Sequence, residues 1–228
     1  MQKYLVDTLK LNKQLYRSEL QINTFGNASI RHKDKCFIKP SGADLNKTSY
    51  KNISVVNIKT GKLISGLKPS VDLNIHLSIY NKFENIKSVI HTHSLYATSW
   101  AQSGRTIPCY GTTHADYFPK EIPITNKLNK KSIKKNYESE IGKSIISKLK
   151  NLKLKAESIP GILIANHGVI SWATSTKVAM ENALAIEFIA KLAFNSELLK
   201  KNVKKLPVAL HNKHFYRKHG KKSYYGQK

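Results

Sequence analysis

The chain has 228 residues, of which 40% are hydrophobic and 9% aromatic, which fits one globular domain with a sizeable core rather than a disordered chain. No stretch approaches the ~18 uncharged apolar residues that a bilayer span needs, and charges begin too early for a signal peptide, so we expect a cytoplasmic protein with no membrane partner. The net charge is +25, but only four of the 39 basic residues are Arg, the residue that recognition of phosphates and bases favours. We therefore predict a solvated lysine surface and no nucleic-acid partner.

Apolar periodicity and turn residues divide the chain into helices and strands. In chain order we predict a helix over 4–16, strands over 28–31, 36–38 and 53–58, a helix over 73–83, a strand over 87–93, helices over 95–102 and 137–152, strands over 162–165 and 169–172, and a helix from Ser175 or Thr176 to about 199. The last two strands resemble a hairpin, which favours antiparallel pairing. We therefore predict the α/β class, as a three-layer α/β/α sandwich with a central, mostly antiparallel sheet.

Two histidines close the strand predicted over 87–93. His91 and His93 are two residues apart, so they project from the same face of a strand. His167 ends a second apolar run, and Asp72 lies at the entry to the helix predicted over 73–83. Three imidazoles and a carboxylate suit Zn²⁺ or a similar divalent ion, whereas a histidine pair by itself is weak evidence for a metal site.

Short motifs then recur in a familiar order along nearly the whole chain. They occupy residues 26–27, 38–42, 68–72, 91–94, 100–102, 111–118, 166–168, 217–220 and 224–227. This pattern resembles the L-ribulose-5-phosphate 4-epimerases, a branch of the class II sugar-phosphate aldolase superfamily, which includes adducin-like domains. The metal pattern is shared with the aldolases of that superfamily, whereas residues 111–118 and 224–227 are typical of the epimerase branch.

The resemblance implies a metal site and a phosphate site. Zn²⁺, with Mn²⁺ or Co²⁺ as alternatives, would be held by four residues, namely Asp72, His91, His93 and His167. The substrate phosphate would be held by Asn27, Lys39, Ser41, Gly42 and Ser70. The chain departs from the family at Val71, where a second serine usually contacts the phosphate. Loss of one hydrogen bond to a charged group costs roughly 1.5–3 kcal/mol, so we expect weaker substrate binding.

The resemblance also implies an acid–base pair. Asp116 and Tyr225 would carry protons on either side of an aldehyde fragment, and His214 and Arg217 would lie near the substrate. In the family the C-terminal tail, residues 209–228 here, enters the active site of a neighbouring subunit in a homotetramer. The implied protein is a single-domain enzyme over 1–228 that interconverts L-ribulose 5-phosphate and D-xylulose 5-phosphate in pentose metabolism, such as arabinose catabolism.

Two other functions remain open at this stage. One is a class II aldolase that cleaves a fuculose- or rhamnulose-type phosphate, although such aldolases generally carry Glu where this chain has Asp72. The other, more remote, is a lysine-rich nucleic-acid-binding protein on an old enzyme fold. Bound metal and release of an aldehyde product would discriminate among the three.

Overall fold

The computed structural model describes residues 1–220 and 223–225. The helices are α1 (Gln2–Arg17), α2 (Leu73–Lys82), α3 (Leu95–Ser103), α4 (Thr112–Ala115), α5 (Lys130–Asn151), α6 (Thr176–Leu199) and α7 (Val208–Lys218). The strands are β1 (Asn27–His32), β2 (Lys35–Ile38), β3 (Ser54–Asn57), β4 (Leu63–Ser65), β5 (Ser88–Thr92), β6 (Gly161–Ile164) and β7 (Gly168–Ala173). Short 3-10 helices cover Tyr50–Asn52 and Ala156–Ser158.

In the described residues the strands form one seven-stranded sheet in the order β4-β3-β2-β1-β5-β7-β6. All six pairings between these strands are antiparallel. The mixed α/β class with an antiparallel sheet is therefore confirmed. β5 lies between β1 and β7, where Asn27 faces His91 on one side and Ile170 faces His91 on the other. The strand that carries the histidine pair is thus held by backbone hydrogen bonds on both edges.

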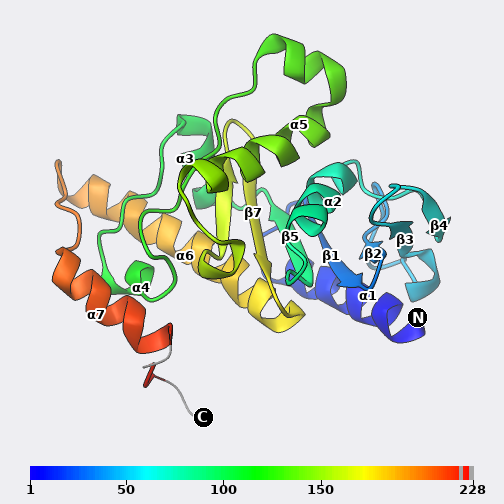
Figure 1. Cartoon of the computed structure of the whole chain (residues 1–228), viewed down its shortest axis with the longest axis horizontal. Coiled ribbons are helices and arrows are strands. Elements are labelled where there is room, and N and C mark those ends of the chain that lie inside the picture. Colours follow the sequence, from blue (N-terminus) through cyan, green and yellow to red (C-terminus); the bar gives the residue numbers. More distant parts are fainter. Residues whose placement is uncertain (221–222, 226–228) are drawn as a thin grey trace.

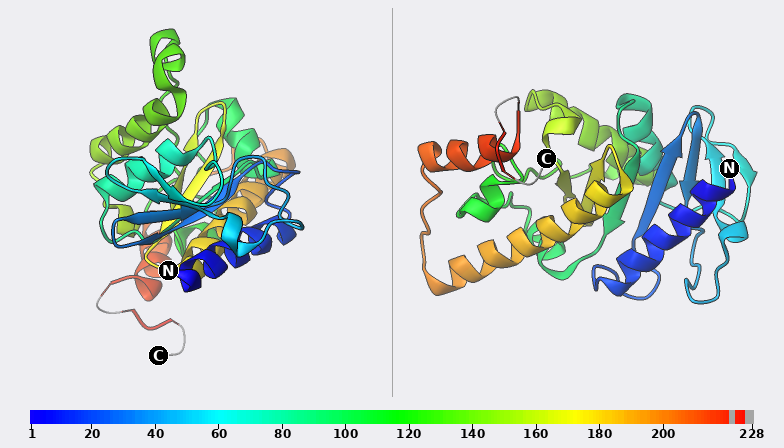
Figure 2. Two further views of the ribbon diagram at one scale, coloured as in Figure 1. Left: turned by 90° about the vertical axis from the view of Figure 1, so that its right-hand side faces the viewer. Right: turned by 90° about the horizontal axis from the view of Figure 1, so that it is seen from below.

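Helices cover both faces of this sheet (Figures 1 and 2). Leu11 and Leu15 of α1 pack with Ile30 of β1, Ile90 of β5 and Met180 of α6 in one cluster of buried residues. On the other face, the largest cluster joins α2 and α5 to the sheet, and it also includes residues of α3 and α6. Side chains alternate along β5, so Ile90 packs under α1 and α6 while His91 faces the other way.

Every predicted helix and strand has a counterpart in the structure. Besides the two 3-10 helices, three short or terminal elements in the described residues were not predicted. These are β4, α4 and α7. β4 has three residues, all exposed, and α4 has four, so neither has enough residues for a periodic pattern. α7 has no buried residue, although its apolar residues gather on one side of the helix.

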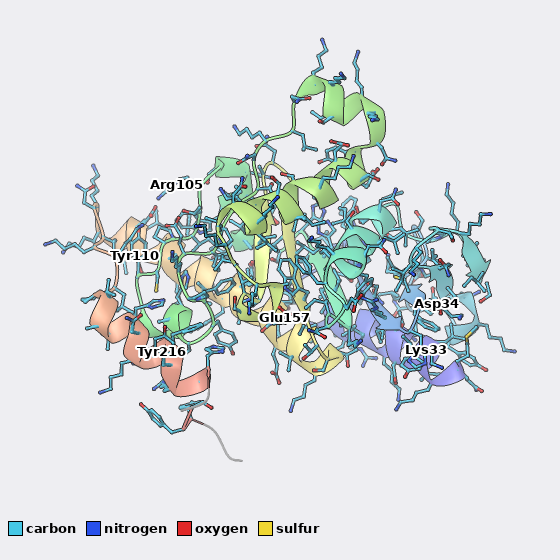
Figure 3. All side chains as sticks on the ribbon, viewed as in Figure 1. Lys33, Asp34, Arg105, Tyr110, Glu157 and Tyr216 are labelled. Carbon is cyan, nitrogen blue, oxygen red and sulfur yellow. The ribbon has the colours of Figure 1, made fainter. Side chains whose placement is uncertain are left out.

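Helix α5 is two helical segments joined by a kink at Asn136, where φ is −158° and ψ is 87°. The Asn129 side chain accepts from Ser132 N at 2.9 Å and begins the first segment. The Asn136 side chain accepts from Ser139 N at 3.3 Å and begins the second, which matches the helix predicted over 137–152. The first segment projects from the body of the protein (Figure 1). Figure 3 shows long side chains extending from it into open space, in agreement with a solvated lysine surface.

No helix in the described part of the chain is long and apolar enough to span a membrane. Cys36 and Cys109 are both buried free thiols. Their burial raises the pKa of the Cys36 thiol to about 12 and that of Cys109 to about 11. Neither is therefore a thiolate nucleophile at neutral pH.

Candidate metal centre

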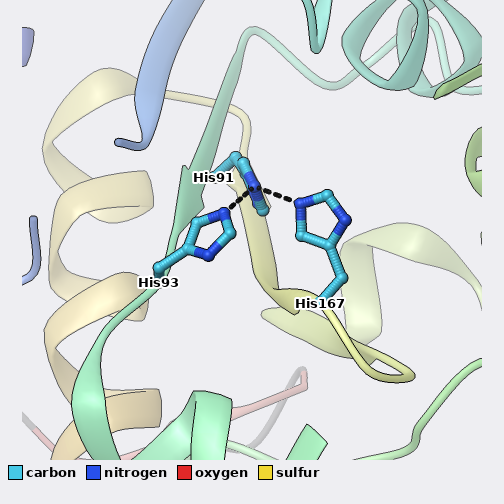
Figure 4. A group of neighbouring side chains, drawn as sticks. All are labelled: His91, His93 and His167. Carbon is cyan, nitrogen blue, oxygen red and sulfur yellow. Dashed lines mark hydrogen bonds between the residues drawn. The ribbon is translucent and has the colours of Figure 1, made fainter. Parts of the chain in front are cut away.

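Three imidazole rings converge at the end of β5. His91 lies in the strand, His93 follows it directly, and His167 lies in the turn between β6 and β7. The Nε2 atom of His91 is 3.1 Å from the Nε2 atoms of both His93 and His167. Figure 4 shows the three rings directed toward one point. Two nitrogen ligands on one tetrahedral Zn²⁺ lie roughly 3.3 Å apart, so the spacing is close to that of a shared ion.

The turn that carries His167 depends on its two neighbours. Asn166 has a positive φ of 60°, a conformation that Asn tolerates better than most residues. Gly168 approaches the backbone so closely that a Cβ there would meet the Thr92 carbonyl and contact the His91 ring. The sequence Asn166-His167-Gly168 therefore brings β7 close to β5 and directs the His167 ring toward the β5 histidines.

The other ring nitrogens of two histidines are hydrogen-bonded. Nδ1–H of His91 donates to the Val169 carbonyl at 3.0 Å, which leaves Nε2 without a proton. Nδ1 of His167 and the phenol oxygen of Tyr137 are 2.9 Å apart. Burial lowers the pKa of His91 to about 3, against the opposing effect of Asp72, and burial also lowers the pKa of His93 and His167. Neutral imidazoles with free Nε2 atoms fit a divalent ion such as Zn²⁺.

Asp72 lies beside this group. Its Oδ2 accepts from Asn27 Nδ2 at 2.7 Å and from Ser70 Oγ at 3.4 Å. Ligand atoms of the three histidines lie within 4.8 Å of one another, and the oxygens of Asp72 are not part of that group. Asp72 also makes no side-chain cap for α2, so its carboxylate is held toward Asn27 rather than toward the helix. Its role as a fourth ligand stays a prediction.

Four of the predicted phosphate residues lie on two loops joined by backbone hydrogen bonds, and the fifth, Asn27, is the first residue of β1. Ser41 N donates to the Lys68 carbonyl and Ser70 N to the Lys39 carbonyl, both at 3.0 Å. Asn27 Nδ2 also donates to Ser70 Oγ at 3.1 Å. Asn27, Lys39 and Ser70 are buried, whereas Ser41 and Gly42 are exposed. The structure thus brings Asn27, Ser70 and Asp72 together, with Ser41 and Gly42 at the rim of the loops.

Lys39 is an unusual buried cation. Its side chain is only 2% exposed, and Nζ donates to the Thr24 carbonyl at 3.0 Å. Burial lowers the pKa of Lys39, although the Asp72 carboxylate opposes the shift. A buried ammonium is costly without an anionic partner, so this position favours an anion close by.

Asp116 is at the centre of a second cluster, made with the C-terminal helix. Arg217 donates to both carboxylate oxygens, at 3.0 and 2.7 Å, and Nδ1–H of His214 donates at 3.2 Å. Lys218 Nζ lies 3.6 Å away. Although burial raises the pKa of Asp116, the hydrogen bond from Arg217 and the charge of Lys218 outweigh it and hold that pKa below the ordinary value. Asp116 is therefore a carboxylate at neutral pH.

Tyr225 lies against the same cluster. Its ring is 4.6 Å from the Arg217 guanidinium and 4.7 Å from the Lys218 ammonium, and its backbone N–H donates to the Arg217 carbonyl at 2.9 Å. A cavity of about 490 Å³ is bordered by Asp116, Lys218 and Tyr225. Residues 221–222 and 226–228, which include the end of the predicted motif over 224–227 and part of the predicted tail over 209–228, lie outside the described residues.

The predicted site residues thus form two groups. Among residues 1–220 and 223–225, no hydrogen bond or ion pair links the Asp116 group to the three histidines. Sequence reasoning missed Tyr137, which contacts His167 and stacks on its ring with centroids 5.8 Å apart. The only sequence signal for it is its place at the start of a predicted helix. Burial, with the charges of Glu138 and Asp72, raises the pKa of Tyr137, so it is a neutral phenol.

Buried histidines outside the metal centre predict a pH dependence. Burial lowers the pKa of His76 and of His114 to about 4 from the ordinary value of 6.5. Between those values the unfolded chain binds more protons, so the free energy of unfolding of metal-free protein falls as the pH drops from about 6.5 to about 4, by up to about 1.4 kcal/mol per pH unit for each histidine. Urea unfolding from pH 7.5 to 4.5 in chelator measures this, and His76→Asn should flatten the profile. A profile as steep in that variant as in the wild type would contradict the assignment to His76.

Comparison with known proteins identifies the family of this chain. A family model described as the class II aldolase and adducin N-terminal domain matches residues 6–194. The chain therefore belongs to the class II aldolase and adducin N-terminal domain family.

Solved structures share this fold. An L-fuculose 1-phosphate aldolase superposes with a TM-score of 0.80 at 22% identity, over 93% of this chain and 94% of that one. The protein YgbL from Klebsiella pneumoniae, described as an aldolase/epimerase/decarboxylase, gives 0.74 at 21% identity, over 93% and 97%. An L-fuculose-1-phosphate aldolase from Thermus thermophilus gives 0.67 at 16% identity, over 87% and 98%. At these identities the likeness concerns the fold.

Proposed function

We propose that the protein is a divalent-metal-dependent epimerase that interconverts L-ribulose 5-phosphate and D-xylulose 5-phosphate. The observation that supports this proposal is the second cluster, in which Arg217 contacts both the carboxylate of Asp116 and the ring of Tyr225. An aldolase needs the metal centre, whereas inversion of a carbinol centre also needs proton carriers on both faces of an aldehyde fragment. Family membership supports an enzyme of sugar-phosphate chemistry.

The reaction cannot be a simple deprotonation. The hydrogen on carbon 4 of the pentulose is not next to the carbonyl at carbon 2, so it is not acidic. Loss of the carbon 4 hydroxyl proton instead lets the bond between carbons 3 and 4 break. Its electron pair passes to the enediolate of dihydroxyacetone, and glycolaldehyde phosphate forms. Rotation of the aldehyde and re-addition of the enediolate to its other face restore the bond and invert carbon 4.

The residues of the first group would hold the metal and the substrate. His91, His93 and His167, with Asp72 as the proposed fourth ligand, would hold Zn²⁺, or Mn²⁺ or Co²⁺. A divalent ion bound there supplies Lewis acidity toward the keto oxygen. The phosphate would be bound by the paired loops, where buried Lys39 provides positive charge; the proposed contacts are Asn27, Lys39, Ser41, Gly42 and Ser70.

The residues of the second group would move the proton of the carbon 4 hydroxyl. Asp116 is ionised and would accept a proton on one side of the aldehyde, and the hydroxyl of Tyr225 would donate one on the other. His214 and Arg217 hold the Asp116 carboxylate at 3.2 and 2.7 Å and would contact the substrate. After one turnover Asp116 carries a proton and Tyr225 is a phenolate, which is the state that the reverse reaction needs. Loss of the Asp116 proton to water and uptake of one from water by Tyr225 restore the starting state.

We further propose that the two groups meet between copies of the chain. What supports this is the absence of any hydrogen bond or ion pair between them in the described part of one chain. A homo-oligomer, in our proposal a tetramer, would combine the metal centre of one copy with the tail of another. The chain would then be one domain over 1–228 whose tail, 209–228, serves a neighbouring subunit. The partners are a small sugar phosphate and further copies of the chain.

Subunit mixing tests this arrangement. His91→Ala and Tyr225→Phe proteins, each inactive alone, are unfolded together, refolded and assayed. If one site needs residues of two copies, random mixing restores both halves in about a quarter of the sites. If each site belongs to a single chain, every site carries one defect and the mixture stays inactive. That second result would overturn the shared site and leave the proposed reaction untouched.

A class II aldolase is the second candidate, and the structural likeness to L-fuculose 1-phosphate aldolase favours it. The test that separates the two supplies L-ribulose 5-phosphate to metal-loaded protein and measures D-xylulose 5-phosphate and free glycolaldehyde phosphate separately. Xylulose phosphate without released aldehyde, abolished by a chelator, is the result expected of the epimerase. Released aldehyde as the main product, or cleavage of fuculose 1-phosphate alone, would identify an aldolase.

Val71 predicts a change in substrate affinity. It lies next to Ser70 at the proposed phosphate site and is 63% exposed, so a hydroxyl there is free to reach a phosphate. Val71→Ser is expected to lower KM about tenfold with little change in kcat, because a hydrogen bond to a charged group contributes roughly 1.5 kcal/mol or more in both ground and transition states. Steady-state kinetics measures this, with Val208→Ser as a control on an exposed valine in α7. An unchanged KM would contradict a phosphate contact at this position.

A further inference from the structure

Tyr137 is a residue outside every motif discussed above, and it lies directly behind one metal-centre histidine. Its phenol oxygen is 2.9 Å from Nδ1 of His167, and the two rings are nearly parallel, with an interplanar angle of 15°. The contact spans 30 positions of sequence and joins the start of a helix to a hairpin turn. The hydroxyl of Tyr137 and the face of its ring therefore both contact the imidazole of His167.

The position of Tyr137 is fixed by how α5 is built. Tyr137 follows the kink at Asn136, whose side chain begins the second segment of α5. That segment packs tightly on α2, because a Cβ at Gly142 would meet the Ser78 side chain, and Ile145 is fully buried. The Tyr137 phenol therefore lies on a helical segment that is fixed by its packing against α2 and the core.

His167 needs such support more than His91 does. His91 belongs to a strand paired on both edges, and its Nδ1–H donates to a backbone carbonyl. His167 belongs to a turn, follows a residue with positive φ and is only partly buried. In the part of the chain that the structure describes, Tyr137 is the one hydrogen-bond partner of its Nδ1. Without the phenol, the contact left to the ring nitrogens is the one of 3.1 Å between Nε2 of His167 and the unprotonated Nε2 of His91. That contact favours the tautomer protonated at Nε2, which cannot bind a metal ion through that atom.

We propose that Tyr137 is a positioning residue whose phenol oxygen accepts from Nδ1–H of His167, which fixes the ring orientation and the tautomer that presents Nε2 to the metal ion. Hydrogen bonds behind metal-binding histidines commonly have this effect, and their removal weakens metal binding about 10- to 100-fold. This inference rests on the metal centre proposed above, but on neither the identity of the sugar nor the oligomeric state.

Zinc affinity is the first test. Zn²⁺ alone is titrated into full-length metal-free protein in competition with a chromophoric chelator, for the wild type, Tyr137→Phe and Tyr110→Phe. Tyr137→Phe keeps the stacked ring and removes the hydroxyl. Tyr110→Phe removes a phenol that donates to Glu197 at 2.7 Å, away from the histidines, and is the matched control. We expect binding 10- to 100-fold weaker in Tyr137→Phe, unchanged binding in Tyr110→Phe, and an unfolding temperature of metal-free Tyr137→Phe close to that of the control.

The second test measures which nitrogen of the His167 ring carries the proton, and its main result comes from the wild-type protein. Long-range proton–nitrogen NMR of the histidine rings in wild-type, metal-free protein should show His167 protonated at Nδ1, and Tyr137→Phe should show both tautomers. A wild-type His167 protonated at Nε2 would overturn the proposal, even if the variant failed to fold. Equal zinc affinity of Tyr137→Phe and wild type would also overturn it and leave the metal centre intact. Wild-type protein that binds no zinc would overturn the metal centre and this inference together.

Discussion

Replacing His91 with alanine is expected to abolish zinc binding and, with it, all sugar-phosphate turnover. His91 is fully buried, and its Nε2 is the atom 3.1 Å from both other histidines. The loss removes a ligand, so it should exceed the roughly 10- to 100-fold effect of removing a group behind a ligand. Titration of Zn²⁺ against a chelator measures the binding, and the coupled assay on L-ribulose 5-phosphate measures the activity.

His76 provides the matched control for this experiment. It is also a fully buried histidine, and its Nδ1 is 2.7 Å from Ser29 Oγ, but it is outside the three-histidine group. Each alanine variant removes one buried imidazole, and large-to-small changes in a core cost about 2–5 kcal/mol. His76→Ala should therefore lose stability and retain zinc binding. Zinc affinity retained in His91→Ala, or lost equally in both variants, would contradict the assignment of the metal centre.

Tyr225→Phe is expected to lower kcat by at least 10²-fold while zinc affinity stays at the wild-type value. The phenol is proposed to carry a proton in each half of the reaction, and positioned proton carriers typically contribute 10²- to 10⁴-fold. The ring that stacks on Arg217 and Lys218 is preserved in the variant. Mutation should thus separate the metal centre from the Asp116 cluster. His91→Ala is expected to lose zinc binding and turnover, and Tyr225→Phe is expected to lose turnover only.

Tyr224 offers an adjacent control. Both tyrosines are exposed, and both backbone N–H groups donate to the Arg217 carbonyl at 2.9 Å. Tyr224→Phe removes the same atom one residue away and should leave kcat within about twofold of wild type, because surface changes without a specific contact have small effects. Full activity of Tyr225→Phe, or equal losses in the two variants, would remove the specific role of the Tyr225 phenol.

The metal histidines could be predicted because their geometry is local. Residues two apart in extended backbone project to the same face, so His91 and His93 are brought together by local geometry alone. His167 was indicated by its position at the end of a second apolar run, and the antiparallel pairing of β5 with β7 explains why the two runs meet. The antiparallel sheet itself was indicated by the hairpin over 161–173.

The contacts of Asp116 and Tyr137 could not be predicted from residue patterns. Arg217 and Asp116 are 101 residues apart, and the periodicity of the helix that carries Arg217 does not indicate which part of the chain that helix contacts. Tyr137 is near His167 because of a kink whose only sequence signal is one asparagine at position 136. The resemblance to a family named Asp116 and Tyr225, but it did not show which side chains hold the Asp116 carboxylate.

The elements that carry His91 and the Asp116 partners differ in burial, and this difference affects how the protein would lose function. Every residue of β5 is buried at the centre of the sheet, so exposing His91 requires the sheet to open, and amide hydrogens of this strand should exchange only through global unfolding. α7 buries no residue and follows a lysine-rich connection over 200–207. Fraying or proteolytic cleavage there would leave a folded protein that keeps the three histidines and Asp116 but lacks Tyr225, the second proposed proton carrier. Loss of catalysis therefore does not require loss of structure.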